Sequence, residues 1–273
     1  MRRTMLLLLL MSVVLAAAEP AKIVLIAGSP SHGPGDHEYR AGLMLLAKCL
    51  RENKGVETVV VKNGWPEDEA VFNGARTIVL FSDGATAHPF LKGNRLEVIG
   101  KLMEKGVGLA CLHYAVEVPK DHGGAEFLKW IGGYYERPYS QNPFNDLEAT
   151  QAAPDHPISR GWKSFRLRDE WYYKMRFTPG NQRVTYILTA MLPKNAPNRE
   201  ALAWATERAD GGRGFGFTGG HPHTNWGVLE FRRLVVNAIL WTAHVEVPRN
   251  GAKCKIAPAD LKQNLDDKKA KKK

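Results

Sequence analysis

Cysteine is scarce in this sequence of 273 residues, which contains only Cys49, Cys111 and Cys254. Three scattered cysteines are too few for a disulfide-stapled scaffold or for a zinc module built on cysteine pairs. The apolar run near the N-terminus, residues 5–15, is shorter than the ~20 residues that a membrane-spanning helix needs. Apolar residues at 44% and charged residues at 24% match an ordinary globular protein, which excludes a wholly disordered or fibrous chain.

A strong basic stripe is missing from the body of the chain, although the net charge is +10. Residues 1–18 carry +2 and residues 262–273 carry +4, which leaves +4 for residues 19–261. Proteins that bind nucleic acids concentrate lysine and arginine on one face of the fold. We therefore expect no nucleic-acid partner, and we interpret the lysine-rich residues 251–273 as a flexible C-terminal tail.

The first 18 residues have the pattern of an export signal peptide. Arg2 and Arg3 precede the apolar run, and three alanines at residues 16–18 come directly before Glu19. Such a signal is removed during export. The sequence therefore predicts a periplasmic or secreted protein with no stable membrane insertion after cleavage, and an uncleaved anchor is the alternative.

Apolar runs and helical patterns alternate along the first half of the chain. Strands that are apolar on both faces and separated by helices predict a mostly parallel central sheet with helices on both faces. The aromatic-rich residues 133–210 hold short alternating runs that extend or flank this sheet. The sequence predicts one α/β domain at residues 19–250, with Cys111 in its core. The expected strands are 22–27, 56–61, 77–81, 107–112 and 215–218, and the expected helices are 43–50, 91–106 and 226–244.

Histidines gather in the loops that leave these strands. Six of the nine histidines lie in four such loops, at positions 32, 37, 88, 113, 221 and 223. Ligands of an open parallel sheet bind beyond the carboxyl ends of its strands, so we expect these loops to meet in one site. Each histidine alone has a structural role as its alternative.

Glu170 is a further candidate for this site, because a carboxylate beside aromatic residues can serve as a metal ligand or proton carrier. The alternative is that Glu170 lies on a surface strand with its charge directed outward. Neutral imidazoles with one carboxylate suit a divalent transition metal such as zinc. We expect catalytic roles for His113, Glu170 and His221 and metal ligation by His32, His113, Glu170 and His221. The expected substrate-binding residues are His37, Asp83, Tyr114, Trp171 and His223.

Five stretches of the sequence resemble the ThuA-like (trehalose-utilisation) family. The resemblance covers residues 22–245 and rests on residues 28–32, 108–113, 155–158, 169–172 and 220–221. It implies a flavodoxin-like α/β fold similar to that of class I glutamine amidotransferases, in which a cysteine on the turn after a central strand pairs with a late histidine and glutamate. Here His113 takes the turn position, Cys111 lies within the strand, and His223 stands where the glutamate is expected. We therefore predict no thiol amidotransferase activity.

The resemblance also implies a small carbohydrate as substrate. It predicts an enzyme that acts on a sugar derivative such as a 3-keto-glycoside, by hydrolysis, elimination or isomerisation, with the assistance of a metal. No nucleotide cofactor is expected, because the glycine-rich residues 211–216 precede a strand rather than a helix. A non-catalytic carbohydrate-binding protein is the alternative function, and the oligomeric state is left open, a homo-oligomer included.

Overall fold

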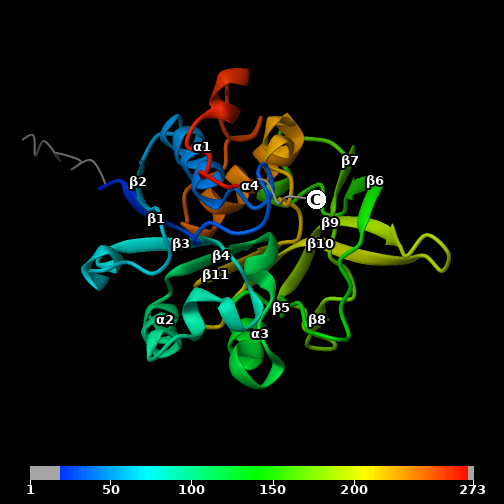
Figure 1. Cartoon of the computed structure of the whole chain (residues 1–273). Coiled ribbons are helices and arrows are strands. Elements are labelled where there is room, and N and C mark those ends of the chain that lie inside the picture. Colours follow the sequence, from blue (N-terminus) through cyan, green and yellow to red (C-terminus); the bar gives the residue numbers. More distant parts are fainter. Residues whose placement is uncertain (1–18, 270–273) are drawn as a thin grey trace, which may run out of the picture.

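A nine-stranded sheet crosses the molecule in the computed structural model, which describes residues 19–269 (Figure 1). Its strand order is β2-β1-β3-β4-β11-β10-β9-β6-β7. The first five strands in this order run parallel to one another. They reproduce the flavodoxin-like order 2-1-3-4-5, which confirms the predicted α/β class. The predicted signal peptide lies outside the described residues.

The parallel half of the sheet consists of buried, largely β-branched and aliphatic strands. In β1, Ile23 and Leu25 enter one hydrophobic core while Val24 and Ile26 enter the other, because successive side chains of a strand point to opposite faces. This pattern requires helices on both sides of the sheet. The parallel strands are β1 (Ala21–Ala27), β2 (Val56–Val61), β3 (Ala75–Phe81), β4 (Gly108–Leu112) and β11 (Arg213–Phe217).

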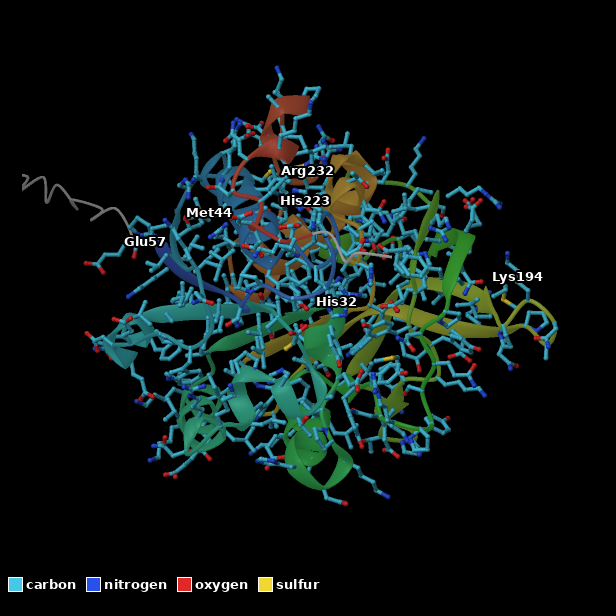
Figure 2. The ribbon with its side chains drawn as sticks, in the orientation of Figure 1. His32, Met44, Glu57, Lys194, His223 and Arg232 are labelled. Atoms are coloured by element: carbon cyan, nitrogen blue, oxygen red, sulfur yellow. The ribbon has the colours of Figure 1, made fainter. Side chains whose placement is uncertain are left out.

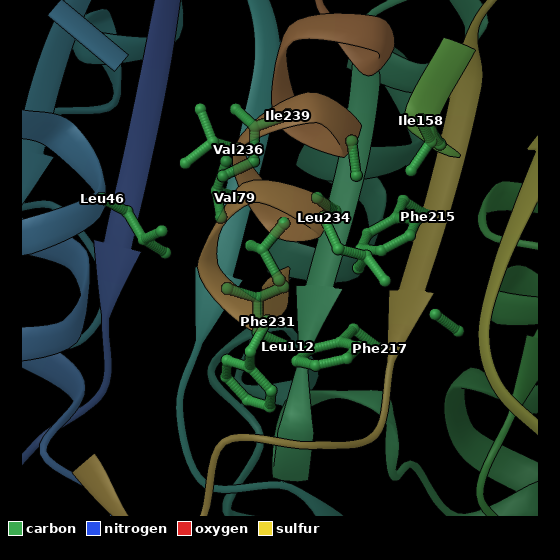
Figure 3. Close-up of a cluster of buried hydrophobic side chains, with 14 of the residues drawn as sticks. Leu46, Val79, Leu112, Ile158, Phe215, Phe217, Phe231, Leu234, Val236 and Ile239 are labelled. Carbon is green, nitrogen blue, oxygen red and sulfur yellow. The ribbon is translucent and has the colours of Figure 1, made fainter. Parts of the chain in front are cut away.

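Two helices cover each face of this half. Helices α1 (Tyr39–Arg51) and α4 (Leu229–Thr242) lie on one face, and α2 (Arg95–Glu104) and α3 (Ala125–Trp130) lie on the other (Figure 1). Figure 3 shows Phe231 and Leu234 of α4 packed against side chains of the central strands, among them Phe217. The predicted closing helix begins at Leu229, because residues 223–227 form a separate 3₁₀ turn.

The second half of the sheet is antiparallel and projects to the right in Figure 1. In β7, residues pair with β6 so that Glu170 lies directly opposite Phe144. Glu170, at the end of β7, lies 3.0 Å from His221, which follows β11, so the end of β7 lies at the rim where the parallel strands end. The antiparallel strands are β6 (Phe144–Gln151), β7 (Phe165–Glu170), β9 (Val184–Leu192) and β10 (Asn198–Glu207), and β5 (Gly133–Tyr134) pairs with β8 (Arg176–Phe177) in a separate two-stranded sheet.

The C-terminal segment is packed where the sequence predicted a flexible tail. Residues 251–269 run back over α1, with Ala252 and Cys254 buried and Lys48 paired to Asp260 at 2.7 Å. The prediction of a flexible tail is wrong for residues 251–269, because residues between the lysines of this segment are buried or paired. Residues 270–273 lie outside the described part. Within residues 19–269, no helix is long and apolar enough to cross a membrane.

Candidate active site

Loops from both halves of the sheet meet at one rim. His37 lies beyond β1, His113 directly follows β4, His221 lies beyond β11, and Glu170 ends β7. One ligand atom from each of these four residues lies within 4.8 Å of all the others. The predicted convergence of distant histidines therefore occurs in the structure, with Glu170 among them.

The imidazoles of His37 and His113 face each other through unprotonated nitrogens. His113 Nδ1 donates to the carbonyl oxygen of Thr218 at 2.8 Å, so the neutral ring carries a lone pair on Nε2. Tyr39 donates its hydroxyl to Asp83 and can only accept from His37 Nδ1, which leaves a second lone pair on His37 Nε2. These two Nε2 atoms are 3.1 Å apart. Two lone pairs at this distance repel each other, and a cation bound by both nitrogens would remove that repulsion.

Glu170 and His221 complete the group. Glu170 Oε2 lies 3.0 Å from His221 Nδ1 and 3.5 Å from His113 Nε2, and His221 Nδ1 lies 2.9 Å from His37 Nε2. Ligand atoms around a tetrahedral zinc ion are ~3.3 Å apart, given Zn–N distances of ~2.0–2.1 Å. Three imidazoles and one carboxylate are a donor set that suits such an ion. The residues of this four-residue cluster therefore fit a divalent transition metal.

Protonation of His37 does not readily relieve the crowding of lone pairs. Burial, together with the neighbouring histidines, lowers the pKa of His37 to about 3, so its ring is neutral near pH 7. Burial alone would raise the pKa of Glu170, but the contacts of its carboxylate with the imidazoles of His113 and His221 outweigh burial and lower that pKa to about 2. The cluster thus holds the Glu170 carboxylate and the His37 imidazole in the forms that bind metals.

The backbone at three of the histidines of the rim is strained. His32, His37 and His113 have φ values of 62°, 48° and 52°, in the left-handed region that non-glycine residues rarely adopt. Such conformations persist only where surrounding contacts enforce them, and they concentrate at functional sites. His113 stands on the turn directly after β4, and this turn aims its ring at the rim. The family resemblance implied this turn position for His113.

Buried Asp169 fixes the loop that carries His221. Its carboxylate accepts hydrogen bonds from the backbone N–H groups of Gly220 and His221 and from the side chain of Asn225. Adjacent strand residues point to opposite sides, so Glu170 faces the cluster while Asp169 points towards the loop of His221.

His32 lies at the mouth of the cluster and not within it. Its ring stacks over that of His37 at a centroid distance of 3.6 Å, and its side chain is 40% exposed. Ser31 donates its hydroxyl to Asp83 and accepts from His32 Nδ1, which leaves His32 Nε2 unprotonated. Tyr114 lies beside both histidine rings. The structure therefore places His37, predicted to bind substrate, in the four-residue cluster, and it places His32 on the open side, in a second group with His37 and Asp83.

Two predicted substrate-binding residues lie away from the rim. Trp171 is fully buried and packs on Phe217 and Phe231, because it follows Glu170 and points to the opposite face. His223 is buried beside the C-terminal segment, and in Figure 2 it lies on the Arg232 side of His32. Both predictions are wrong in this respect.

His88 and Cys111 are structural residues. His88 is fully buried, where Nε2 contacts the carbonyl oxygen of Ala115 and Nδ1 accepts from the N–H of Phe90. Cys111 is buried within β4, and burial raises the pKa of its thiol. A buried, protonated thiol is a poor nucleophile.

Sequence reasoning missed several residues of the site. Tyr39 holds His37, and Tyr172 places its hydroxyl 3.4 Å from His113 Nε2. Phe144 is 42% exposed and its ring lies 4.8 Å from that of His221. The position of Tyr39 next to the His37 loop was a usable signal, whereas Phe144 reaches the site only through its pairing with β7.

The chain belongs to the ThuA family, whose description is trehalose utilisation. The model of this family matches residues 24–242. This membership confirms the resemblance and connects the protein with carbohydrate utilisation. A search of curated proteins finds no match.

Solved structures share the fold. A ThuA-like protein from Parabacteroides merdae ATCC 43184 has 18% identity and a TM-score of 0.64, covering 89% of this chain and 99% of that one. Another from Bacteroides uniformis ATCC 8492 has 17% identity and a TM-score of 0.61, covering 83% and 93%. The carbohydrate deacetylase Agd3 has 13% identity and a TM-score of 0.50, covering 82% of this chain and 32% of that one.

Proposed function

We propose that this protein is a carbohydrate-processing enzyme that uses a divalent metal ion to cleave a keto-glycoside. The observation that carries the proposal is the 3.1 Å approach of two imidazole nitrogens, Nε2 of His37 and Nε2 of His113, beside the Glu170 carboxylate. A site that only binds sugars needs no such concentration of lone pairs.

The metal would be held by His37, His113, Glu170 and His221, and when bound it would act as a Lewis acid on a carbonyl oxygen. Tyr39 and Thr218 fix the tautomers of two ligands through their Nδ1 atoms. Such outer partners raise the basicity of a ligand and hold its orientation. The protein thus supplies a site whose ligands are set before the ion arrives.

His32 is the proton acceptor in this proposal. Its Nε2 is unprotonated and lies on the open side of the cluster, while Ser31 holds Nδ1. A ketone on the sugar ring acidifies the adjacent C–H, so His32 Nε2 can remove that proton. The C–H electron pair forms a carbon–carbon double bond as the bond to the glycosidic oxygen breaks. The leaving oxygen takes the proton back from His32, and addition of water to the double bond completes a net hydrolysis.

Phe144 and Tyr114 are the proposed sugar-binding surfaces. The two side chains flank the cluster, Phe144 at His221 and Tyr114 at His32. Flat aromatic faces match the apolar faces of sugar rings. A small carbohydrate therefore suits this rim better than a macromolecule.

The test combines metal analysis with turnover. The purified protein should bind about one equivalent of a transition metal such as zinc, and it should cleave 3-keto-trehalose but not trehalose. Removal of the metal with a chelator should abolish cleavage, and added metal should restore it. His32→Ala should keep the metal and lose turnover, whereas His113→Ala should lose both. Tight sugar binding without turnover would contradict the proposal and favour the binding-protein alternative.

A further inference from the structure

Lys268, in the C-terminal segment, contacts the loop of residues 33–38 that carries His37. Lys268 Nζ donates to the carbonyl oxygens of Asp36 and His37, at 2.5 Å and 3.1 Å. The same ammonium group lies 3.2 Å from a carboxylate oxygen of Glu38. A single lysine side chain thus contacts three consecutive residues of the loop, one of which is a proposed metal ligand.

Glu38 joins the loop to the segment from the other side. Its Oε1 accepts the N–H of Gly35, and its Oε2 accepts the N–H of Asp266. The side chains of Glu38 and Lys268 are 1% and 5% exposed. Lysine and glutamate are almost never buried to this degree unless they are paired. The burial of this pair therefore marks a specific contact and not a solvated tail.

Arg40 fastens the segment a second time. It donates to the carbonyl oxygens of Asn264 and Leu265 and pairs with Asp266 at 3.1 Å. All of these contacts lie within three residues of His37, whose backbone is in the left-handed region. A strained conformation needs surrounding contacts to enforce it, and the C-terminal segment supplies several of them.

We propose that residues 264–268 form a positioning clasp that holds the His37 loop in the conformation required for metal binding. Lys268 neutralises Glu38 and satisfies two carbonyl oxygens of the loop, so the loop cannot turn His37 away without leaving a buried charge unpaired. Lys268 is a positioning residue, because it contacts the backbone of a ligand and does not reach the cluster itself. The expected effect on metal affinity rests on the proposed function, whereas the expected effect on the mobility of the loop does not.

The first experiment measures the loop directly in the metal-free, full-length protein. Lys268→Ala should increase backbone amide exchange in residues 33–38 at least tenfold by mass spectrometry, because the carboxylate that holds the Gly35 N–H loses its partner. Lys269→Ala removes the neighbouring exposed lysine and should leave exchange unchanged. Lys268→Arg retains a cationic donor and should restore part of the protection. If Lys268→Ala does not fold, Arg40→Ala tests the same clasp from its exposed side and should raise exchange in the same residues.

The second experiment measures metal binding. Lys268→Ala should weaken Co²⁺ affinity about 10–100-fold, the range typical of outer partners of metal ligands, and should change the visible absorption spectrum of the bound ion. Lys48→Ala breaks the pair with Asp260, which precedes the clasp in the chain, and should leave the Co²⁺ affinity and the spectrum unchanged.

The two experiments separate the clasp from the proposed function. Unchanged exchange in residues 33–38 in both Lys268→Ala and Arg40→Ala overturns the clasp, whatever the metal result. Equal Co²⁺ affinity of wild type and Lys268→Ala also overturns it. A wild-type protein that binds no metal overturns the proposed function, and amide exchange still decides the clasp.

Discussion

Tyr39 Oη lies 2.6 Å from Nδ1 of His37 and donates its own hydrogen to Asp83 at 2.7 Å. The phenol therefore accepts from His37 and fixes which imidazole nitrogen faces the cluster. Tyr39 follows the His37 loop by two residues, so the first turn of α1 carries the partner of the ligand that the loop presents.

Replacement of Tyr39 by phenylalanine tests this relationship. The variant keeps the buried ring and loses the acceptor of His37 Nδ1, so zinc affinity should fall about 10–100-fold in competition with a chromogenic chelator. Tyr134→Phe is the matched control, because it removes a buried hydroxyl that donates to Glu136 in a different network. Equal zinc affinities of the two variants would show that the Tyr39 hydrogen bond does not act on the metal.

Removal of a ligand should have a larger effect than removal of its partner. His113→Ala deletes one of the two facing Nε2 atoms, so metal affinity should fall by more than the 10–100-fold of an outer partner. Elemental analysis after dialysis measures the loss, and turnover of the keto-sugar should fall with it. His122→Ala, at an exposed histidine, should retain wild-type metal content.

The convergence of the histidines was predictable, and the choice among them was not. The carboxyl ends of parallel strands share one rim, and this rule alone predicts that His113 and His221 lie close together. The placement of His32 and His37 depends on the path of the first loop, where both residues adopt left-handed backbone conformations that no local sequence pattern requires.

Two other errors have a different physical origin. The lysine-rich C-terminus has the composition of a solvated tail, yet Lys268 is buried because Glu38, from the opposite end of the chain, neutralises it. Trp171 was assigned to the substrate because it adjoins Glu170, although side chains at consecutive strand positions point to opposite faces. The first error required knowledge of the tertiary structure, whereas strand alternation alone would have corrected the second.

Glu117 should make stability depend on pH. It is 3% exposed, and burial raises its pKa from 4.5 to about 7 despite the opposing effect of Arg137. Since the pKa is higher in the folded state, the stability associated with the neutral carboxyl is fully present below pH 4.5 and is lost as pH rises towards 7. The loss is at most about 3 kcal/mol.

The measurement is the free energy of unfolding in urea at several pH values across this window. Glu117→Gln keeps the shape of a neutral carboxyl and cannot ionise, so its stability should fall less than that of the wild type as pH rises. Glu97→Gln, at an exposed carboxylate paired only with Lys101, should follow the wild type. Parallel curves for Glu117→Gln and the wild type would contradict the raised pKa.

Truncation of Phe144 tests the proposed sugar-binding surface. Phe144 lies opposite Glu170 in the β6–β7 pairing and exposes its ring beside His221 without reaching the ligand atoms. Phe144→Ala should therefore raise KM for the keto-glycoside about 2–10-fold, the equivalent of the ~0.5–1.5 kcal/mol of an aromatic contact, and leave kcat and metal content nearly unchanged. Tyr186→Ala removes an aromatic side chain of similar exposure from β9 and should leave both KM and kcat at wild-type values. A fall in kcat without a change in KM would assign Phe144 to the support of His221 and not to the substrate.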